Sequence, residues 1–343
     1  MKHSITLNLK ISLCLIAALI LTGCTPYTPK DAYITRTVIC FDTYIKINIY
    51  DPADKDLADD CIDLCYYYED LLSATVKGSD IYRINSAGTE PVAVSSDTIF
   101  LLKEAVRYRD ISDGLLDISM APLTGLWTKA REDELVPGED EVGALLDHVG
   151  LDNIVIDEEG SSVKKLDPEV SLDLGALGKG FVADKLKEML VSRGVKSAIV
   201  SLGGNIITVG SKPDGQPFHI GIKRPFARDI DVSASLNLSD KSVVTSGIYE
   251  RYFEKDGKIY HHILDPQSGF PKDTDLYSAT VISDSSLEGD ALSTVCLLYG
   301  LDRATELINK TPGVEAVFIT GDNKLHYTGG ASSIIEMPVR TDE

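Results

Sequence analysis

Positive charge is scarce in this sequence. Its 343 residues contain 33 lysines and arginines against 53 aspartates and glutamates, a formal net charge of −20 at pH 7. Proteins that bind nucleic acid present clustered positive charge to phosphates, so nucleic acid is excluded as an expected partner. An acidic protein that binds a phosphorylated small molecule must neutralise its charge locally, with a metal ion, backbone N–H groups or a few cations. The charge balance therefore favours a metal.

Cysteines are also few. Two of the six lie in the N-terminal segment described below, and four remain: Cys40, Cys61, Cys65 and Cys296. None of these forms the closely spaced pairs of structural zinc sites. Cys61 and Cys65 are one helical turn apart on a face shared with Leu57, so we expect buried thiols without chemistry.

The apolar run Ile11–Leu21 is too short to cross a bilayer well. It follows Lys2 and Lys10 and precedes small residues, which is the order of a secretory signal peptide. The ending Leu-Thr-Gly-Cys resembles the bacterial lipobox, and this resemblance implies cleavage before Cys24 and diacylation of its thiol. The alternative is an ordinary signal peptide with a chance cysteine. A lipidated Cys24 predicts an extracytoplasmic protein anchored to the bacterial cell membrane.

The length after the signal peptide, about 320 residues, exceeds what one ordinary core organises and predicts two lobes. We find no internal repeat and no low-complexity segment. The expected organisation is a signal peptide at 1–23, a lipidated cysteine and tether at 24–35, a two-lobed domain at 36–335 and a C-terminal tail at 336–343.

The periodicity of apolar residues predicts an α+β fold with antiparallel sheets and packed helices. Alternation indicates strands at 43–50, 153–160, 197–204 and 217–225, and hairpins at 251–263 and 314–329. Helical periodicity covers 55–72, 96–110, 286–300 and 301–309. Strands grouped in hairpins, with few strict βαβ units, argue against a doubly wound sheet.

The segment SLDLGALGKGFVADKL, residues 171–186, places glycines and Lys179 before a helical pattern. A glycine-rich turn that enters a helix is a natural anion site. The spacing matches neither a P-loop nor the dinucleotide fingerprint. Two interpretations remain open from these residues: a phosphate-binding turn, or a tight connection whose glycines serve turn geometry.

Asp290 and Thr294 lie four residues apart in a helical pattern, so both side chains project from one face. A carboxylate and a hydroxyl suit Mg²⁺, which takes one or two protein carboxylates and completes its shell with water and phosphate oxygens. The alternative is an acid that complements the dipole near a helix start, with Thr294 simply packed.

His261 and His262 end a predicted strand and lead into a turn at Asp265-Pro266. A histidine held in this way has a pKa suited to a general base for a hydroxyl nucleophile. A strand-end histidine bonded to the turn backbone is the alternative. Because neighbouring side chains on a strand face opposite sides, we expect only one of the two to face a cleft.

Taken in order, these segments resemble the ApbE family of FAD:protein FMN transferases over roughly residues 36–335. DLGALGKGFVADKL resembles the family's Asp-Leu-Gly…Lys-Gly…Asp segment, SLGGNI its Gly-Gly-Asp/Asn strand end, and HILDPQSG its His-Ile-Asp-Pro-x-Ser/Thr-Gly segment. DALST matches outright, and SDIYRIN and SDGLLDISMAPLTGLW resemble its N-terminal segments. Phe41-Asp42-Thr43 stands where the family usually has Met-Gly-Thr.

The resemblance implies a T-fold-related, two-lobed architecture with an FAD cleft between the lobes. It implies Mg²⁺-dependent transfer of FMN from FAD to a threonine of an acceptor flavoprotein, such as a redox-pump subunit, with release of AMP. Mn²⁺ could replace Mg²⁺. FAD hydrolysis to FMN and AMP, or FAD binding without turnover, are the alternatives.

The same resemblance implies site residues, which we carry over only to matching positions. His262 would be the catalytic base. The FAD contacts would be Leu115, Leu116, Asp117, Asp173, Lys179 and Leu264. The metal would take the Ala176 carbonyl, the Asp290 carboxylate and the Thr294 hydroxyl, while glycines of the 171–186 segment let the backbone approach the pyrophosphate.

Overall fold

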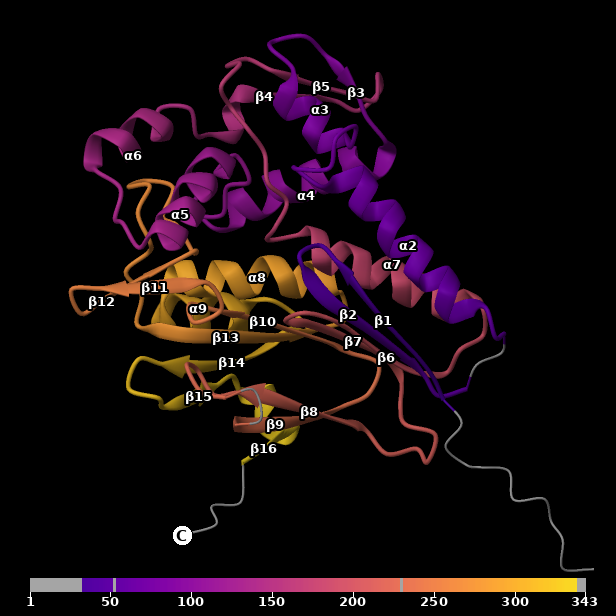
Figure 1. The fold of residues 1–343 in the computed structure, drawn as a ribbon. Helices are drawn as coiled ribbons and strands as arrows, with labels where there is room; N and C mark the ends of the chain where they lie inside the picture. Colours follow the sequence, from indigo (N-terminus) through magenta and orange to yellow (C-terminus); the bar gives the residue numbers. More distant parts are fainter. Residues whose placement is uncertain (1–32, 52–53, 229–230, 338–343) are drawn as a thin grey trace, which may run out of the picture. The chain divides into compact units, whose positions relative to one another are not determined.

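An eight-stranded antiparallel sheet forms the centre of this computed structural model, which describes residues 33–51, 54–228 and 231–337 (Figure 1). The strand order is β1-β2-β6-β7-β10-β13-β14-β15. The bounds of these strands are β1 Ile34–Cys40, β2 Thr43–Ile49, β6 Ser197–Leu202, β7 Asn205–Gly210, β10 Ser242–Gly247, β13 Leu276–Ser283, β14 Glu315–Thr320 and β15 Leu325–Tyr327.

Helices cover one face of this sheet. They are α2 Leu57–Leu72, α7 Gly178–Ser192, α8 Ser286–Tyr299 and α9 Leu301–Lys310. Their apolar sides and the facing strand residues form the largest core of the described chain, which includes Cys61, Cys65 and Cys296. The four cysteines of the described residues are free and buried, and burial raises the pKa of the Cys61 and Cys65 thiols to about 12. The expectation of buried thiols is confirmed.

A second, three-stranded sheet packs on the opposite face. Its strands are β8 Phe218–Lys223, β9 Val232–Leu238 and β16 Ile335–Glu336. Phe218, Ile220 and Leu236 contribute to a separate apolar cluster with Ile282 and Val317 of the main sheet. The main sheet is therefore buried on both faces over much of its width.

The remaining elements form a region that borders the helical face (Figure 1). They are α3 Asp80–Ser86, β3 Val92–Ala93, α4 Ser96–Ile111, α5 Ala121–Asp133, α6 Glu139–Leu146, the 3₁₀ turn Leu151–Asn153, β4 Ile154–Asp157, β5 Ser162–Lys165, β11 Tyr252–Lys255 and β12 Lys258–His261. The 3₁₀ turn Gly329–Ser333 lies elsewhere, because its Ala331 packs in the cluster of the three-stranded sheet. Trp127 of α5 packs with Phe253 and Leu264, and its indole Nε1 donates to the Gly269 carbonyl at 2.8 Å. This contact joins α5 to the turn that follows β12.

The predicted α+β class, the predicted strands and hairpins and the four long helices are confirmed. The 251–263 hairpin turns at Asp256-Gly257, where φ is 53° and 74°, as a two-residue loop requires. The apolar pattern predicted no element over 121–146 or 232–247, which hold α5, α6, β9 and β10. Glycines and polar residues interrupt the apolar pattern there.

The predicted signal peptide and Cys24 lie outside the described residues, as does most of the predicted tether. Strand β1 begins at Ile34, just before the expected start of the domain at 36. Among the helices that the structure describes, none combines the length and apolar character needed to cross a membrane.

Candidate active site

One cleft of about 930 Å³ gathers every residue that the sequence analysis assigned to FAD, metal or catalysis. Its lining includes Leu115, Leu116, Asp117, Asp173, Ala176, Lys179, His262, Leu264, Asp290 and Thr294. These residues come from the loop before α5, the entry to α7, the turn after β12 and the middle of α8. The tertiary structure brings these residues together, whereas their individual roles stay predictions.

The entry to α7 is shaped by Asp173. Its Oδ1 accepts a hydrogen bond from the Gly175 N–H at 2.8 Å, and its own N–H donates to the Ile118 carbonyl at 2.7 Å. The carboxylate thereby forms a tight turn, because a short acid bonds readily to the backbone two residues on. The turn places Ala176 and Lys179 on the cleft wall.

Gly180 serves helix packing. A Cβ on this residue would lie 2.4 Å from the Ser286 carbonyl oxygen and 2.7 Å from the Leu287 Cα, so only glycine lets α7 cross α8 so closely. Asp184, one turn later on α7, accepts hydrogen bonds from the N–H groups of Ser286 and Leu287 at 2.7 and 3.0 Å. The expectation that the glycines of this segment act on a pyrophosphate therefore does not extend to Gly180, whose contacts are with α8.

The crossing of α7 and α8 brings the Gly180 N–H within hydrogen-bond distance of Asp290. The Gly180 N–H donates to Asp290 Oδ2 at 2.9 Å, and Lys179 Nζ lies 3.7 Å from Oδ1. Lys179 also donates to the Gly175 carbonyl at 2.8 Å. Because Asp290 is only 3% exposed, this one N–H and one cation are what offset its desolvation. The result is a buried negative charge at the cleft wall.

The hydrogen bond from the Gly180 N–H to Asp290 also affects the Ala176 carbonyl. In a continuous helix the Gly180 N–H would bond to the Ala176 carbonyl four residues earlier. It donates to Asp290 instead, and α7 begins only at Gly178. The Ala176 carbonyl therefore lacks this helical partner, and Ala176 lines the cleft.

Thr294 adds a hydroxyl to the oxygen atoms available as metal ligands. Its Oγ1 donates to the Asp290 carbonyl at 3.3 Å and lies 3.4 Å from Ser246 Oγ, which in turn contacts Ser293 Oγ at 2.8 Å. Carboxylate, hydroxyl and carbonyl oxygens are the ligands that Mg²⁺ prefers. In the part of the chain that the structure describes, no group of three or more His, Cys, Asp or Glu side chains could hold a metal. A cation bound by these three oxygens would therefore need further ligands from a phosphate or water.

The two histidines have different environments. His261 is 6% exposed, its Nε2 donates to the Lys272 carbonyl at 3.1 Å, and its Nδ1 accepts from the Ile263 N–H at 3.3 Å. Both ring nitrogens are thus used, and burial lowers its pKa to about 4. His261 matches the structural alternative, a histidine that bonds to the turn backbone.

His262 follows the last residue of β12, and among the described residues only one of its two ring nitrogens has a hydrogen-bond partner. Its Nδ1 lies 3.3 Å from the Arg251 carbonyl, which can only accept, so Nδ1 carries the proton. The lone pair is then on Nε2. Burial, followed by the positive charge of Arg251, lowers the pKa of His262 to about 4 and keeps the ring neutral at pH 7. A neutral ring with one free acceptor nitrogen is the form that a general base needs.

These two pKa shifts predict acid-sensitive stability. Each histidine binds a proton more readily in the unfolded chain, near pH 6.5, than in the fold, so stability falls as the pH drops from 6.5 towards 4. A shift of this size corresponds to about 3 kcal/mol. We expect His261→Gln to show a smaller loss of melting temperature between pH 7 and 4.5 than the parent protein. Scanning calorimetry at several pH values measures this, with the exposed His219→Gln as control. Parallel curves for all three proteins would contradict the assignment.

Asp117 lines the cleft, and its carboxylate also bonds to its own loop. Its Oδ1 accepts from the Ser119 N–H and hydroxyl at 2.8 and 2.6 Å, and Oδ2 accepts from the Leu151 N–H at 3.3 Å. Arg109 lies 3.7 Å away. The carboxylate thus holds the loop that carries the buried Leu115 and Leu116 at the cleft.

The cleft is lined by three further cationic side chains, which the sequence did not predict. They are Arg131 of α5, Lys223 of β8 and Arg251 before β11. Together with Lys179 they gather positive charge inside a strongly acidic protein. No local pattern could have found them, because each comes from a different element.

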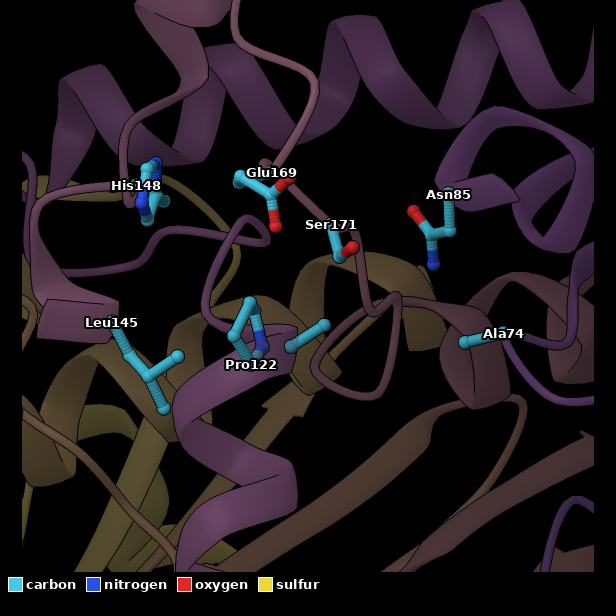
Figure 2. Close-up of a pocket in the computed structure, with 8 residues that line it drawn as sticks. Ala74, Asn85, Pro122, Leu145, His148, Glu169 and Ser171 are labelled. Carbon is cyan, nitrogen blue, oxygen red and sulfur yellow. The ribbon is translucent and has the colours of Figure 1, made fainter. Parts of the chain in front are cut away.

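A smaller cavity of about 400 Å³ lies behind the segment that leads to Asp173 (Figure 2). Glu169 and Ser171 of that segment line it opposite Pro122 and Leu145. Asn85 holds the segment in place, because its amide donates to the Leu172 carbonyl at 2.9 Å and accepts from the Leu172 N–H at 2.7 Å. This cavity neighbours the cleft, because Ala74 lines both of them.

Known proteins resemble the chain in sequence and in fold. The ApbE family model matches residues 41–318. The FAD:protein FMN transferase of Klebsiella pneumoniae (strain 342) is 37% identical over 78% of this chain and 83% of its own, and that of Treponema pallidum is 31% identical over 86% and 87%.

Solved structures give the same result. The ApbE protein of Thermotoga maritima superposes with a TM-score of 0.80 at 28% identity, over 88% of this chain and 99% of its own. The flavin transferase ApbE of Vibrio cholerae gives 0.79 at 28% identity over the same shares. Matching sequence and architecture lead to one conclusion: this chain belongs to the ApbE family.

Proposed function

We propose that this protein transfers FMN from FAD to a threonine hydroxyl of an acceptor protein, with release of AMP and with Mg²⁺ as cofactor. The observation that carries the proposal is the convergence in one cleft of Asp290, Thr294, Ala176 and a neutral His262. The relatives named FAD:protein FMN transferases support the same reaction.

In this mechanism His262 Nε2 accepts the proton of the threonine hydroxyl. The threonine oxygen forms a bond to the FMN-side phosphorus, the phosphoanhydride bond breaks, and AMP leaves with the bonding electrons. Lys179, once it turns from Gly175 to the substrate, neutralises phosphate charge. Asp290, Thr294 and the Ala176 carbonyl would hold Mg²⁺, which supplies charge neutralisation at the pyrophosphate.

Incubation of the full chain with FAD and Mg²⁺ tests the proposal, with and without a threonine-bearing acceptor domain from a redox-pump subunit. A covalent, fluorescent acceptor band that depends on Mg²⁺ is the expected result. FMN and AMP formed at the same rate without acceptor would identify a hydrolase, and unchanged FAD would identify a binding protein. Mn²⁺ in place of Mg²⁺ tests the breadth of the metal site.

We further propose that Cys24 anchors the enzyme outside the cytoplasm, where its acceptor would be a membrane redox protein. The LTGC ending after a short apolar run supports this. We expect Cys24→Ser to move the protein from the membrane fraction to the soluble extracytoplasmic fraction, measured by immunoblotting after fractionation. Unchanged membrane association would contradict it, and Cys14→Ser is the matched control.

A further inference from the structure

Two apolar side chains at one end of the β1–β2 hairpin are unusually exposed. Tyr44 is 70% and Ile39 is 65% exposed, the highest values among the large hydrophobic side chains of the described residues. The two residues are directly paired across the strands, so their side chains lie on the same face of the sheet. They therefore form one apolar surface, which we call the hairpin patch.

The hairpin patch is confined to one end of the hairpin. On the same face, the next cross-strand pairs are Thr37 with Lys46 and Thr35 with Asn48, all polar. Just after the neighbouring strand β6, the Gly203 N–H donates to the Tyr44 carbonyl at 3.3 Å, and glycine has no side chain to cover the ring. Apolar exposure is thus limited to the end where the strands turn.

On β6 and β7, apolar side chains of this sheet face are covered. Ile199, opposite Asn48, and Ile206, opposite Ser201, pack against the apolar cluster of the three-stranded sheet. That sheet leaves the hairpin patch exposed. A contiguous apolar surface left open in this way commonly marks an interaction site.

The hairpin patch is continuous with the cleft. The turn residues Phe41, Asp42 and Thr43 line the cleft, as does Gly203. Phe41 and Asp42 have φ of 53° and 54°, and the Phe41 N–H donates to Glu69 Oε1 at 2.6 Å, which ties the turn to α2. Any protein segment that reaches the cleft over this turn must pass the hairpin patch.

We propose that the hairpin patch docks the folded acceptor protein, through apolar side chains on its surface outside the short segment that carries the threonine. This inference rests on the proposed function. A net charge of −20 disfavours an anionic bilayer as the occupant. A second copy of this chain bound to the patch would cover the rim of the substrate cleft beside it. This disfavours self-association through the patch.

The test compares the full chain with the double variant Ile39→Ser/Tyr44→Ser. Thr37→Ala/Lys46→Ala, on the polar part of the same face, is the matched control. Each protein is assayed with two acceptors: a threonine-bearing domain from a redox-pump subunit, and a short synthetic peptide with the same threonine. We expect the double variant to raise KM for the domain at least about tenfold and to leave kcat and KM for the peptide within twofold.

The outcomes separate the inference from the proposed function. Transfer by the parent protein with equal KM for the domain in all three proteins would overturn the docking surface alone. No transfer by the parent protein would overturn the proposed function. A change from dimer to monomer in the double variant, or loss of binding to anionic vesicles, would assign the patch to a second copy or to a membrane and overturn the acceptor as occupant. Unchanged FAD binding and melting temperature confirm that the double variant is folded.

Discussion

Replacing Asp290 by alanine abolishes Mg²⁺-dependent transfer of FMN, with a loss of at least about 1,000-fold, if the proposed metal site is correct. Asp290 is the carboxylate among the three assigned oxygens, and its charge is held at the cleft wall by the Gly180 N–H and Lys179. Its loss removes most of the attraction for a divalent cation. Single-turnover assays in buffer freed of other metals measure the effect.

Because the variant leaves the Gly180 N–H without its acceptor, its fold must be checked by circular dichroism and thermal melting. Calorimetric titration with Mg²⁺ in the presence of FAD gives a readout independent of activity, and we expect no saturable binding. Glu288→Gln, on the same helix but outside the cleft lining, is the matched control and should keep full activity. A folded Asp290→Ala protein that transfers FMN at the parent rate would refute the metal assignment.

Replacing His262 by alanine is expected to lower the transfer rate by at least about 100-fold at neutral pH, because a general base contributes about 10²–10⁴-fold. FAD affinity should change much less, since the ring acts on the hydroxyl and not on the phosphates. His261→Gln should keep most activity, because glutamine can replace both the donor to Lys272 and the acceptor for Ile263. Equal rates for His262→Ala and the parent protein would exclude His262 as the base.

The pH dependence offers a second test of His262. From sequence alone, activity would fall below roughly pH 6, at the ordinary pKa of histidine. Burial lowers the pKa of His262 to about 4 in the free protein, so the acid limb of kcat/KM should lie near pH 4. Bound phosphates favour the protonated ring, so the acid limb of kcat should lie at higher pH. An acid limb of kcat/KM at pH 6 or above would contradict this environment for His262.

Local patterns were enough to predict much of this protein. The alternation in 43–50 and 197–204 and the helical spacing of Asp290 and Thr294 are properties of neighbouring residues, and the structure has β2, β6 and α8 at these places. Family motifs then indicated the cleft residues, and each of them lines it.

Other features depend on residues far apart in the sequence, and only the tertiary structure decided them. Gly180 looked like part of a phosphate turn, but its role depends on Ser286, which reaches it when α7 crosses α8. The difference between His261 and His262 depends on the carbonyls of Lys272 and Arg251, because these determine which ring nitrogen remains free.

The sequence by itself determined the α+β class, the ApbE resemblance and the motif residues of the cleft, because periodicity and motifs are local. The tertiary structure decided which charges are desolvated, which polar atoms already have partners and which apolar side chains remain exposed. Desolvation and exposure are set by neighbours from other elements, as at Asp290 and Tyr44. No local pattern contains that information.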